Sequence, residues 1–390
     1  MAGRIVLFGA TGYTGRLTAE AMVERGMRPV LAARSRDKLE GLAAELGGDL
    51  ETRTADVADP PSVAALVERG DVLVTTVGPF ARWGQPAAAA ATTKGAHYLD
   101  STGEPAFIRE VFERYGPPAE QAGIGMLTAM GYDWVPGNLA GGLALERAGD
   151  LATRVDVGYF ITGSGARPSG GTQASLVGAI VAPAYGFRDG RIQTERGAKR
   201  VRSFRVGSKD LSGISVGSSE HFTLPRVASR LREVNAYLGW FGPASRPMQV
   251  FSACTSIGMK VPGAEKLWSA AADRFVQGST GGPDAETRAK SGSLIVAIAY
   301  DASGRELTKV TLRGVDGYTF TGRMLAWAAE RAASGGLKAT GALGPVDGLG
   351  LYELKEGVAE AGLSEEGGPD GGTAGAGGAQ SAGRAGAAAR

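Results

Sequence analysis

The chain has 390 residues, a formal net charge of +2 at pH 7 and a single cysteine, Cys254. This length exceeds the ~250 to 300 residues at which one hydrophobic core stops growing, so two domains are expected. The basic residues are scattered, which argues against a nucleic-acid-binding face, and one cysteine excludes an internal disulfide framework. The first residues lack the pattern of a secretory signal peptide, and the apolar stretch 174–183 is far shorter than the ~20 residues that span a bilayer. We therefore expect a cytoplasmic protein with no transmembrane segment.

The first stretch of the chain predicts a nucleotide-binding turn. Residues 4–8 form a short apolar run, followed by glycines at three-residue spacing and then by helix-favouring sequence. Such a strand, turn and helix directs backbone N–H groups and the positive end of the helix dipole toward a phosphate. We expect Gly9 to form the tight turn, Gly12 to let the pyrophosphate approach, and Gly15 to pack the helix on the strand. With 62 glycines in the chain the spacing alone is weak evidence, and its place after an N-terminal strand is what favours cofactor binding. The predicted cofactor contacts in this turn are Gly9, Thr11, Gly12, Tyr13, Thr14 and Gly15.

The end of the second predicted strand, residues 29–33, selects the cofactor. It is followed by Arg34, Ser35 and Arg36, and the nearest carboxylate, Asp37, lies inside the next helix. An acidic residue at this position would bind the ribose hydroxyls of NAD, whereas arginine suits the 2′-phosphate of NADP. A merely solvated basic helix start is disfavoured, because cations oppose the dipole at a helix N-terminus. We predict NADP(H), held in part by Arg34 and Ser35.

Residues 1–130 predict a Rossmann domain, a doubly wound parallel sheet with strand order 3-2-1-4-5-6. Strands are expected at 50–54, 71–76, 96–100 and 124–129, and helices at 37–46, from 59–60 onward, at 85–95 and at 105–115. Asp56 is predicted to touch the adenine, although a turn or capping role explains it equally well. The loop after the fourth strand and the exit loop of the fifth face the cofactor in such a sheet. The predicted contacts there are Val77, Gly78, Pro79, Phe80 and Gly103.

Residues 131–335 predict a second α+β domain with an antiparallel sheet, which would receive the substrate. Strands are expected at 155–161, within 192–206 and 232–240, and in a hairpin formed by 293–300 and 307–312. Helices are expected at 172–181, 267–276 and 320–333. Residues 336–364 should pack back on the body through a helix at 351–361. The last residues, 365–390, predict a disordered tail, because beyond Glu366 the chain holds 17 Gly or Ala among 24 residues.

Seven stretches are informative in combination: 9–15, 77–80 with Gly84 and Pro86, 97–104, 131–136, 169–172, 317–321 and 344–345. Together they resemble the saccharopine-dehydrogenase-like oxidoreductases, in particular the bacterial trans-acting enoyl reductases, and the likeness covers residues 1 to about 364. The family as we know it has Phe at position 132, Ser at 134 and Ser-Asp at 137–138, where this chain has Tyr132, Trp134 and Gly137-Asn138. The resemblance implies hydride transfer from NADPH to the C=C bond of an α,β-unsaturated acyl thioester. The substrate would be small or held on a carrier protein, and we keep a homodimer open.

Tyr132 and Asp133 are the predicted catalytic residues, because they leave the sixth strand toward the predicted cleft. Tyr132 could protonate a carbanion or polarise a carbonyl, and packing on the nicotinamide explains it equally well. Four other polar residues near the strand ends are candidates with structural alternatives: His97, Tyr98, Asp100 and Glu104. Two histidines and one cysteine leave no Cys/His metal cluster. Two other functions stay open: a non-catalytic NADP sensor, and an imine or ketone reductase whose cleft cations would be Arg167, Arg188 and Arg191.

Overall fold

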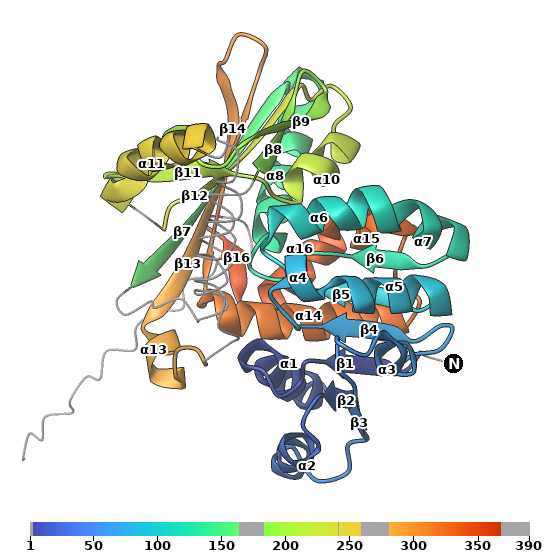
Figure 1. Ribbon diagram of the computed structural model, residues 1–390. Helices are drawn as coiled ribbons and strands as arrows, with labels where there is room; N and C mark the ends of the chain where they lie inside the picture. Colours follow the sequence, from blue (N-terminus) through green and yellow to red (C-terminus); the bar gives the residue numbers. More distant parts are fainter. Residues whose placement is uncertain (1–2, 164–182, 241, 259–280, 368–390) are drawn as a thin grey trace, which may run out of the picture.

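The computed structural model describes residues 3–163, 183–240, 242–258 and 281–367. Two β-sheets form the body of the protein, and helices pack against both of them (Figure 1). The predicted helices at 172–181 and 267–276, and the predicted tail from Gly368 onward, lie outside the described residues.

The first sheet is parallel throughout and confirms the predicted Rossmann order. Its strands run β3-β2-β1-β4-β5-β6, and a seventh strand, β15, extends the β6 edge. The apolar runs of β2 and β4 are buried at every position, as expected for strands covered by helices on both faces. The bounds are β1 (Ile5–Phe8), β2 (Val30–Ala33), β3 (Thr52–Thr54), β4 (Val72–Thr75), β5 (His97–Asp100), β6 (Gly125–Leu127) and β15 (Gly341–Leu343).

The helices between these strands match the predicted ones closely, with one extension. The helix expected at 105–115 continues through a π-helical turn at Val111–Tyr115 into α7 and ends at Ala122. Gly123 then adopts a left-handed conformation that stops the helix. The bounds are α1 (Tyr13–Glu24), α2 (Arg36–Glu45), α3 (Pro60–Ala64), α4 (Phe80–Trp83), α5 (Gln85–Lys94), α6 (Pro105–Glu110) and α7 (Gly116–Ala122).

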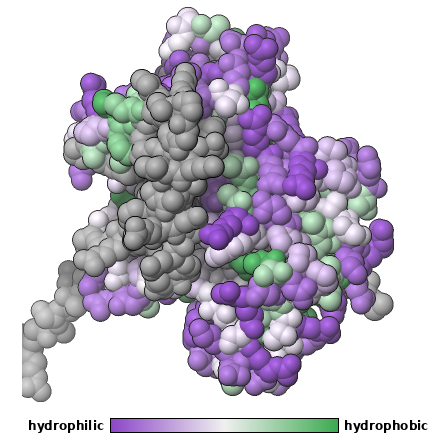
Figure 2. Space-filling model, in the orientation of Figure 1, coloured by the Kyte–Doolittle hydropathy of each residue, from purple (hydrophilic) through white to green (hydrophobic). Residues whose placement is uncertain are grey.

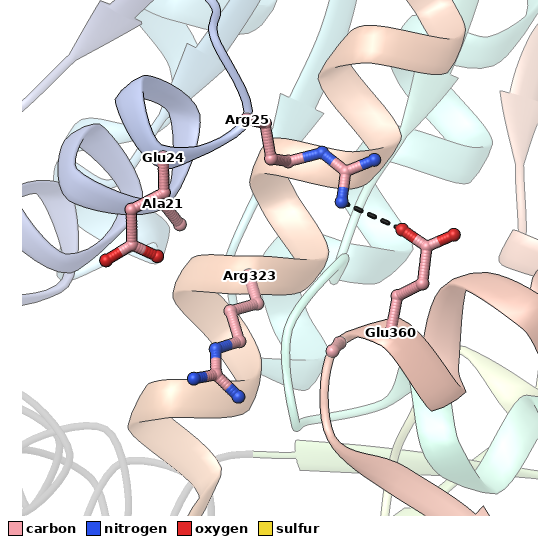
Figure 3. A pocket seen from close by; sticks show the side chains of 6 residues that line it. Ala21, Glu24, Arg25, Arg323 and Glu360 are labelled. Carbon is pink, nitrogen blue, oxygen red and sulfur yellow. Dashed lines mark hydrogen bonds and ion pairs between the residues drawn. The ribbon is translucent and has the colours of Figure 1, made fainter.

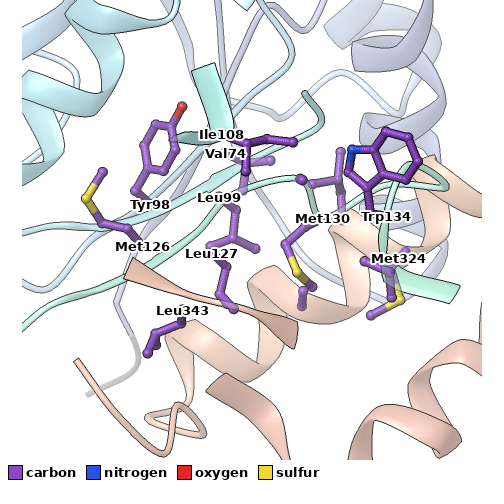
Figure 4. Packing of buried hydrophobic residues seen from close by; sticks show 14 of the residues in the cluster. Val74, Tyr98, Leu99, Ile108, Met126, Leu127, Met130, Trp134, Met324 and Leu343 are labelled. Carbon is purple, nitrogen blue, oxygen red and sulfur yellow. The ribbon is translucent and has the colours of Figure 1, made fainter. Parts of the chain in front are cut away.

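Two C-terminal elements complete the first sheet. The helix α14 (Gly317–Ala333) falls in the range expected for the second domain, yet it packs against α1 and against strands β1, β4 and β5. The approach is close, since a Cβ on Gly322 would lie 2.9 Å from the carbonyl oxygen of Leu17. Figure 4 shows the shared core, in which Met324 of α14 lies near Met130 and Trp134. The first sheet is therefore built from both ends of the chain.

The second sheet is largely antiparallel, as predicted, and contains one parallel pair. Strands β7 and β12 pair in parallel, whereas β13 pairs antiparallel with β7 and β14. The parallel pair arises because four strands separate β7 from β12 in the sequence, so no hairpin fixes their relative direction. The bounds are β7 (Arg154–Gly163), β8 (Pro183–Arg188), β9 (Arg191–Arg196), β10 (Val201–Val206), β11 (Lys209–Val216), β12 (Glu233–Leu238), β13 (Ser291–Tyr300), β14 (Glu306–Gly314) and β16 (Leu363–Glu365).

The strand β16 also corrects the predicted start of the tail. Glu365, placed by the sequence in the tail, ends a strand that pairs with β14. Its carboxylate forms an ion pair with Arg147, with atoms 2.5 Å apart. The ordered body therefore includes residues 365–367.

A helix that the sequence did not reveal, α8 (Val135–Ala148), packs against the second sheet. Its residues from Val135 to Leu145 are all buried, and it contacts β7, β13 and β14. Glycines allow this packing, because a Cβ on Gly141 would lie 2.7 Å from Leu224 and one on Gly142 would lie 2.8 Å from Leu351. A helix buried on all sides has no polar face, so no amphipathic period marks it.

The remaining helices cover the second sheet and the C-terminal side. Their bounds are α10 (Glu220–Val227), α11 (Ser245–Gly258), α13 (Ala285–Ala289), α15 (Pro345–Leu349) and α16 (Leu351–Glu360), with 3-10 turns at Gly149–Leu151 and Gly242–Ala244. Hydrophilic residues predominate on the face of the described residues seen in Figure 2, and one small apolar area there lies over α11, where Val250 and Phe251 are exposed. Among the described residues, no helix is long and apolar enough to cross a bilayer.

Candidate active site

The glycine turn between β1 and α1 has the geometry expected of a dinucleotide-binding loop. Gly9 has a φ of +92°, which permits the tight turn. A Cβ on Gly15 would lie 2.1 Å from the carbonyl oxygen of Gly9 and 2.9 Å from Cα of Ala10, so only glycine allows the helix to approach the strand this closely. Gly12 is the N-cap of α1. Among the described residues no side chain caps this helix, and its first turn contains no acidic residue. The positive end of α1 is therefore open to an anion.

The other residues of the turn have more varied environments. Thr11 and Thr14 are partly exposed beside Gly12. The Tyr13 hydroxyl donates to the carbonyl of Pro283 and accepts from Arg288 at 2.9 Å. The Tyr13 side chain thus joins the turn to the segment that precedes α13, which leaves its backbone N–H as the group able to meet a phosphate.

The residues after β2 fit the 2′-phosphate of NADP. Arg34 is exposed and forms no ion pair with any described residue. Ser35 caps α2, its Oγ accepting from the Lys38 N–H at 3.5 Å. Asp56 accepts from the Ala58 N–H at 2.9 Å, which is the turn role that the sequence left open.

We expect Arg34→Ala to weaken NADPH binding by about ten- to hundredfold while leaving NADH binding unchanged. The reason is the loss of a charge-assisted contact worth about 1.5 to 3 kcal/mol. Fluorescence titration of wild type and variant with NADPH and with NADH measures this change in affinity. Lys38→Ala removes a neighbouring cation of α2 and is the matched control. An equal loss of NADPH affinity in both variants would mean that the positive charge of this surface attracts the cofactor without a specific contact from Arg34.

The loop after β4 is held by its neighbours on both sides. Thr76 Oγ1 donates to the Gly9 carbonyl at 3.2 Å, and Val77 lies against the glycine turn. On the other side, the Glu104 carboxylate accepts from the N–H groups of Phe80 and Ala81, at 2.8 and 3.0 Å. This loop, which includes Gly78 and Pro79, therefore joins the glycine turn to the exit loop of β5, and Glu104 has a structural role.

Three more of the sequence candidates, Asp100, Tyr98 and His97, have structural surroundings. Asp100 is buried and accepts from the N–H groups of Thr102 and Ala129 and from the Thr128 hydroxyl, at 2.8 to 2.9 Å. Burial raises its pKa to about 6, against the opposing effect of these hydrogen bonds. Tyr98 is buried in the core of the first sheet (Figure 4). His97 Nδ1 accepts from the Gly125 N–H at 3.0 Å, and burial lowers the pKa of its ring.

Unlike Asp100 and Glu104, Asp133 has a carboxyl group that is free to act as a proton donor, because one of its oxygens has no partner among the described residues. A Cβ on Gly103 would lie 3.0 Å from Asp133 Oδ2, so the carboxyl group lies against the exit loop of β5. Its Oδ1 atom is buried and has no hydrogen-bond partner among the described residues. Burial raises the pKa of this carboxyl to about 7. A carboxylic acid that is protonated near neutral pH is suited to donate a proton.

Tyr132, the other predicted catalytic residue, is held by hydrogen bonds and by packing against other aromatic rings. Its N–H donates to Thr321 Oγ1 at 2.9 Å and its hydroxyl donates to the Phe160 carbonyl at 3.3 Å. The ring packs edge-on against Tyr159 and Phe320, and burial raises the pKa of its hydroxyl. Of Tyr132 and Asp133, Asp133 is therefore the better candidate for proton transfer.

Two polar residues of the second domain, Tyr159 and Glu220, lie beside the residues that follow Asp133, and the sequence did not single them out. The Tyr159 hydroxyl donates to Glu220 Oε1 at 2.5 Å and accepts from the Gly137 N–H at 2.9 Å. Glu220 is fully buried at the start of α10. No signal could have found the pair, because Tyr159 reads as a core residue of β7 and Glu220 as an ordinary first-turn acid.

This arrangement explains one departure from the family pattern. A Cβ on Gly137 would lie 2.0 Å from the Tyr159 hydroxyl and 2.4 Å from Glu220 Oε1. The serine expected there is therefore incompatible with the Tyr159–Glu220 hydrogen bond. Its neighbour Asn138 is buried and donates to Ser219 Oγ at 2.9 Å.

A separate surface pocket lies at the other end of α1. It is lined by residues of α1, α14 and α16, and has a volume of about 420 Å³. Figure 3 shows the ion pair between Arg25 and Glu360, 2.8 Å apart, that spans it. Because α1 has 12 residues and rises about 1.5 Å per residue, this pocket is well separated from the glycine turn. It is not the site that the glycine turn and Asp133 define.

The fold and the glycine turn define a dinucleotide-binding protein of the Rossmann class. More narrowly, residues 5–127 match the family model of the saccharopine dehydrogenase NADP binding domain. The predicted family resemblance and the predicted NADP cofactor are thereby confirmed.

Relatives of known name match about a third of the chain. A putative trans-acting enoyl reductase of Mycobacterium tuberculosis is 40% identical over 141 residues, which cover 35% of this chain and 34% of that protein. A trans-acting enoyl reductase of Mycobacterium leprae is 40% identical over 140 residues, with the same coverage. The chain thus matches about a third of the length of these relatives.

Solved structures resemble the whole fold at low identity. The apo saccharopine dehydrogenase (L-Glu forming) of Saccharomyces cerevisiae aligns with a TM-score of 0.57 and 14% identity, over 93% of this chain and 99% of that one. A homospermidine synthase of Legionella pneumophila, solved with NAD, aligns with a TM-score of 0.57 and 9% identity, over 94% and 92%. At these identities the likeness concerns the fold alone.

Proposed function

We propose that this protein is an NADPH-dependent reductase of an electron-poor double bond, most directly the C=C bond of an α,β-unsaturated polyketide or fatty acyl thioester, free or carried by a carrier protein. The substrate class rests on the printed names of the mycobacterial relatives, which are trans-acting enoyl reductases. The observation that carries the reaction type is Asp133, an acid with a buried, unpartnered oxygen beside Gly103 at the carboxyl edge of the first sheet.

The residues of the first domain would hold the cofactor. The N–H groups of Gly12, Tyr13 and Thr14 at the start of α1 would bind the pyrophosphate, and Arg34 the 2′-phosphate. The loop from Val77 to Phe80 and the backbone at Gly103 border the same edge of the sheet, where the nicotinamide of such a cofactor lies. When bound, NADPH supplies the hydride.

Asp133 would supply the proton that completes the reduction. Hydride addition to the β-carbon of an enoyl thioester places negative charge on the thioester oxygen and the α-carbon, and a proton must then reach the α-carbon. The protonated carboxyl of Asp133 can donate it and is left as a carboxylate, which regains a proton from solvent. The backbone N–H groups of Gly170, Gly171 and Thr172 would stabilise the enolate oxygen in this proposal, and these residues lie outside the described ones.

The test is incubation with NADPH and a panel of enoyl thioesters, imines and ketones, followed by cofactor absorbance and by mass spectrometry of the products. We expect a gain of two hydrogens on the enoyl thioesters. A gain only on an imine or a ketone would assign the protein to another reductase class. Cofactor binding without turnover of any substrate would instead favour an NADP sensor.

A further inference from the structure

Behind Asp133, the second domain contributes a second buried acid that the proposed reaction does not use. Glu220 Oε1 accepts the hydrogen bond of Tyr159, whereas Glu220 Oε2 is buried and, like Asp133 Oδ1, has no hydrogen-bond partner among the described residues. Two carboxyl groups thus each present one unpaired oxygen to the interior. A buried polar atom without a partner is costly, and its presence in two neighbouring acids calls for a functional reason.

The chain joins the two acids through a rigid frame. Asp133 lies between Tyr132 and Trp134, whose rings both pack edge-on against Tyr159 at 5.9 and 5.2 Å. The Trp134 carbonyl lies 3.0 Å from the Tyr159 hydroxyl. The same hydroxyl donates to Glu220, so Tyr159 contacts Glu220 and also both residues that flank Asp133.

Hydrogen bonds to the Glu220 carboxyl lower its pKa, but burial has the larger and opposite effect. Burial raises the pKa of Glu220 to about 7, and the charge of Asp133 acts in the same direction. Burial lowers the pKa of the neighbouring His221 to about 4, so its ring is neutral, and it raises the pKa values of Tyr159 and Tyr185. No lysine or arginine of the described ranges forms an ion pair with either carboxyl. Charged groups that act on His221 and Tyr185 from further away are Arg188, Glu195, Arg200, Arg109 and Glu113.

We infer that Glu220, held by Tyr159, is a positioning residue that forms a coupled acid pair with Asp133 and keeps Asp133 protonated for its donation step. Two like charges in one dry site repel, so the pair loses its last proton only at a higher pH than either acid alone would. The second domain thereby sets the pH range in which the first domain's acid can act. This inference rests on the proposed function for its consequence, but the coupling itself is a property of the folded chain.

The coupling can be measured without any substrate, by a double-mutant cycle in the free energy of unfolding. Asp133→Asn and Glu220→Gln each remove a charge with little change of shape, and Gln can still accept from Tyr159. At pH 8.5 each single variant should unfold at a higher urea concentration than the wild type, and the double variant should gain less than the sum. At pH 5, where both acids are protonated, the two changes should be additive.

A matched control cycle pairs Asp133→Asn with Asp347→Asn, a half-buried acid of α15 whose ion pair with Arg226 is separate from this site. Those two changes should be additive at both pH values. Additivity of the Asp133–Glu220 cycle at pH 8.5 would overturn the inference, whatever the enzyme does.

The pH profile of turnover tests the consequence. In Glu220→Gln the fall in kcat at high pH should move down by about one pH unit, because Asp133 no longer feels a second carboxylate. Tyr185→Phe removes a buried hydroxyl bonded to the Ser218 carbonyl and should leave the profile in place. An unmoved profile in Glu220→Gln would refute the positioning role. Coupling in the cycle together with no turnover of any substrate would instead refute the proposed function and leave the acid pair standing.

Discussion

Replacing Gly15 with alanine is expected to weaken NADPH binding on the order of a hundredfold and to lower the melting temperature by several degrees. The added Cβ would lie 2.1 and 2.8 Å from the carbonyl oxygen and carbon of Gly9. Both are backbone atoms, so α1 or the turn itself must move. Overpacking of this kind costs about 1 to 3 kcal/mol, and a displacement of ~1 Å in a binding frame can cost ~100-fold in function.

Gly41→Ala in α2 is the matched control. A Cβ there has nothing within 4 Å, and the residue is exposed within the helix. Alanine should stabilise the protein by about 0.5 to 1 kcal/mol and leave the cofactor affinity unchanged. Calorimetry and fluorescence titration of both variants separate the effects. Gly15→Ala protein with wild-type affinity and stability would show that the turn is looser than its geometry indicates.

Asp133→Asn is expected to lower kcat for enoyl reduction by about 10²- to 10⁴-fold, the usual contribution of a positioned acid. Burial raises the pKa of Asp133 to about 7, so its acid form predominates below that pH and is lost above it. Wild-type kcat should therefore fall as the pH rises through this value, whereas the residual kcat of the variant should not.

Asp150→Asn, at an exposed acid, is the control for the Asp133 prediction and should behave as the wild type. NADPH affinity should be unchanged in both variants, since Asp133 is assigned to the proton and not to the cofactor. If Asp133→Asn kept full activity, the proton would have to come from another group.

The Rossmann domain could be predicted from the sequence because its rules are local. Each strand is a short apolar run, and Gly9 and Gly15 reveal a turn whose geometry only glycine permits. The tip of β2 identified the cofactor for the same reason, since Arg34 and Ser35 follow the strand directly.

Elements defined by distant contacts escaped prediction. The three residues of β15 have no pattern of their own and become a strand only because the β6 edge accepts them. In α8, three glycines lower the helix propensity, so the sequence does not predict a helix there. The structure explains these glycines by close packing: Gly137 lies against Tyr159, Gly141 against Leu224 and Gly142 against Leu351. Glu220 joins the site through Tyr159, a contact across 61 residues of sequence that no local pattern records.

The return of α14 and β15 to the first sheet also bears on how the protein is made. A ribosome synthesises a chain from its N-terminus, and most domains can fold once their own residues have emerged. Here the apolar face of α1 that packs on α14, and the open edge of β6, stay uncovered until residues 317–343 have been translated. The nascent N-terminal half is thus a prime binding target for chaperones, and expression of residues 1–130 alone should yield aggregated protein.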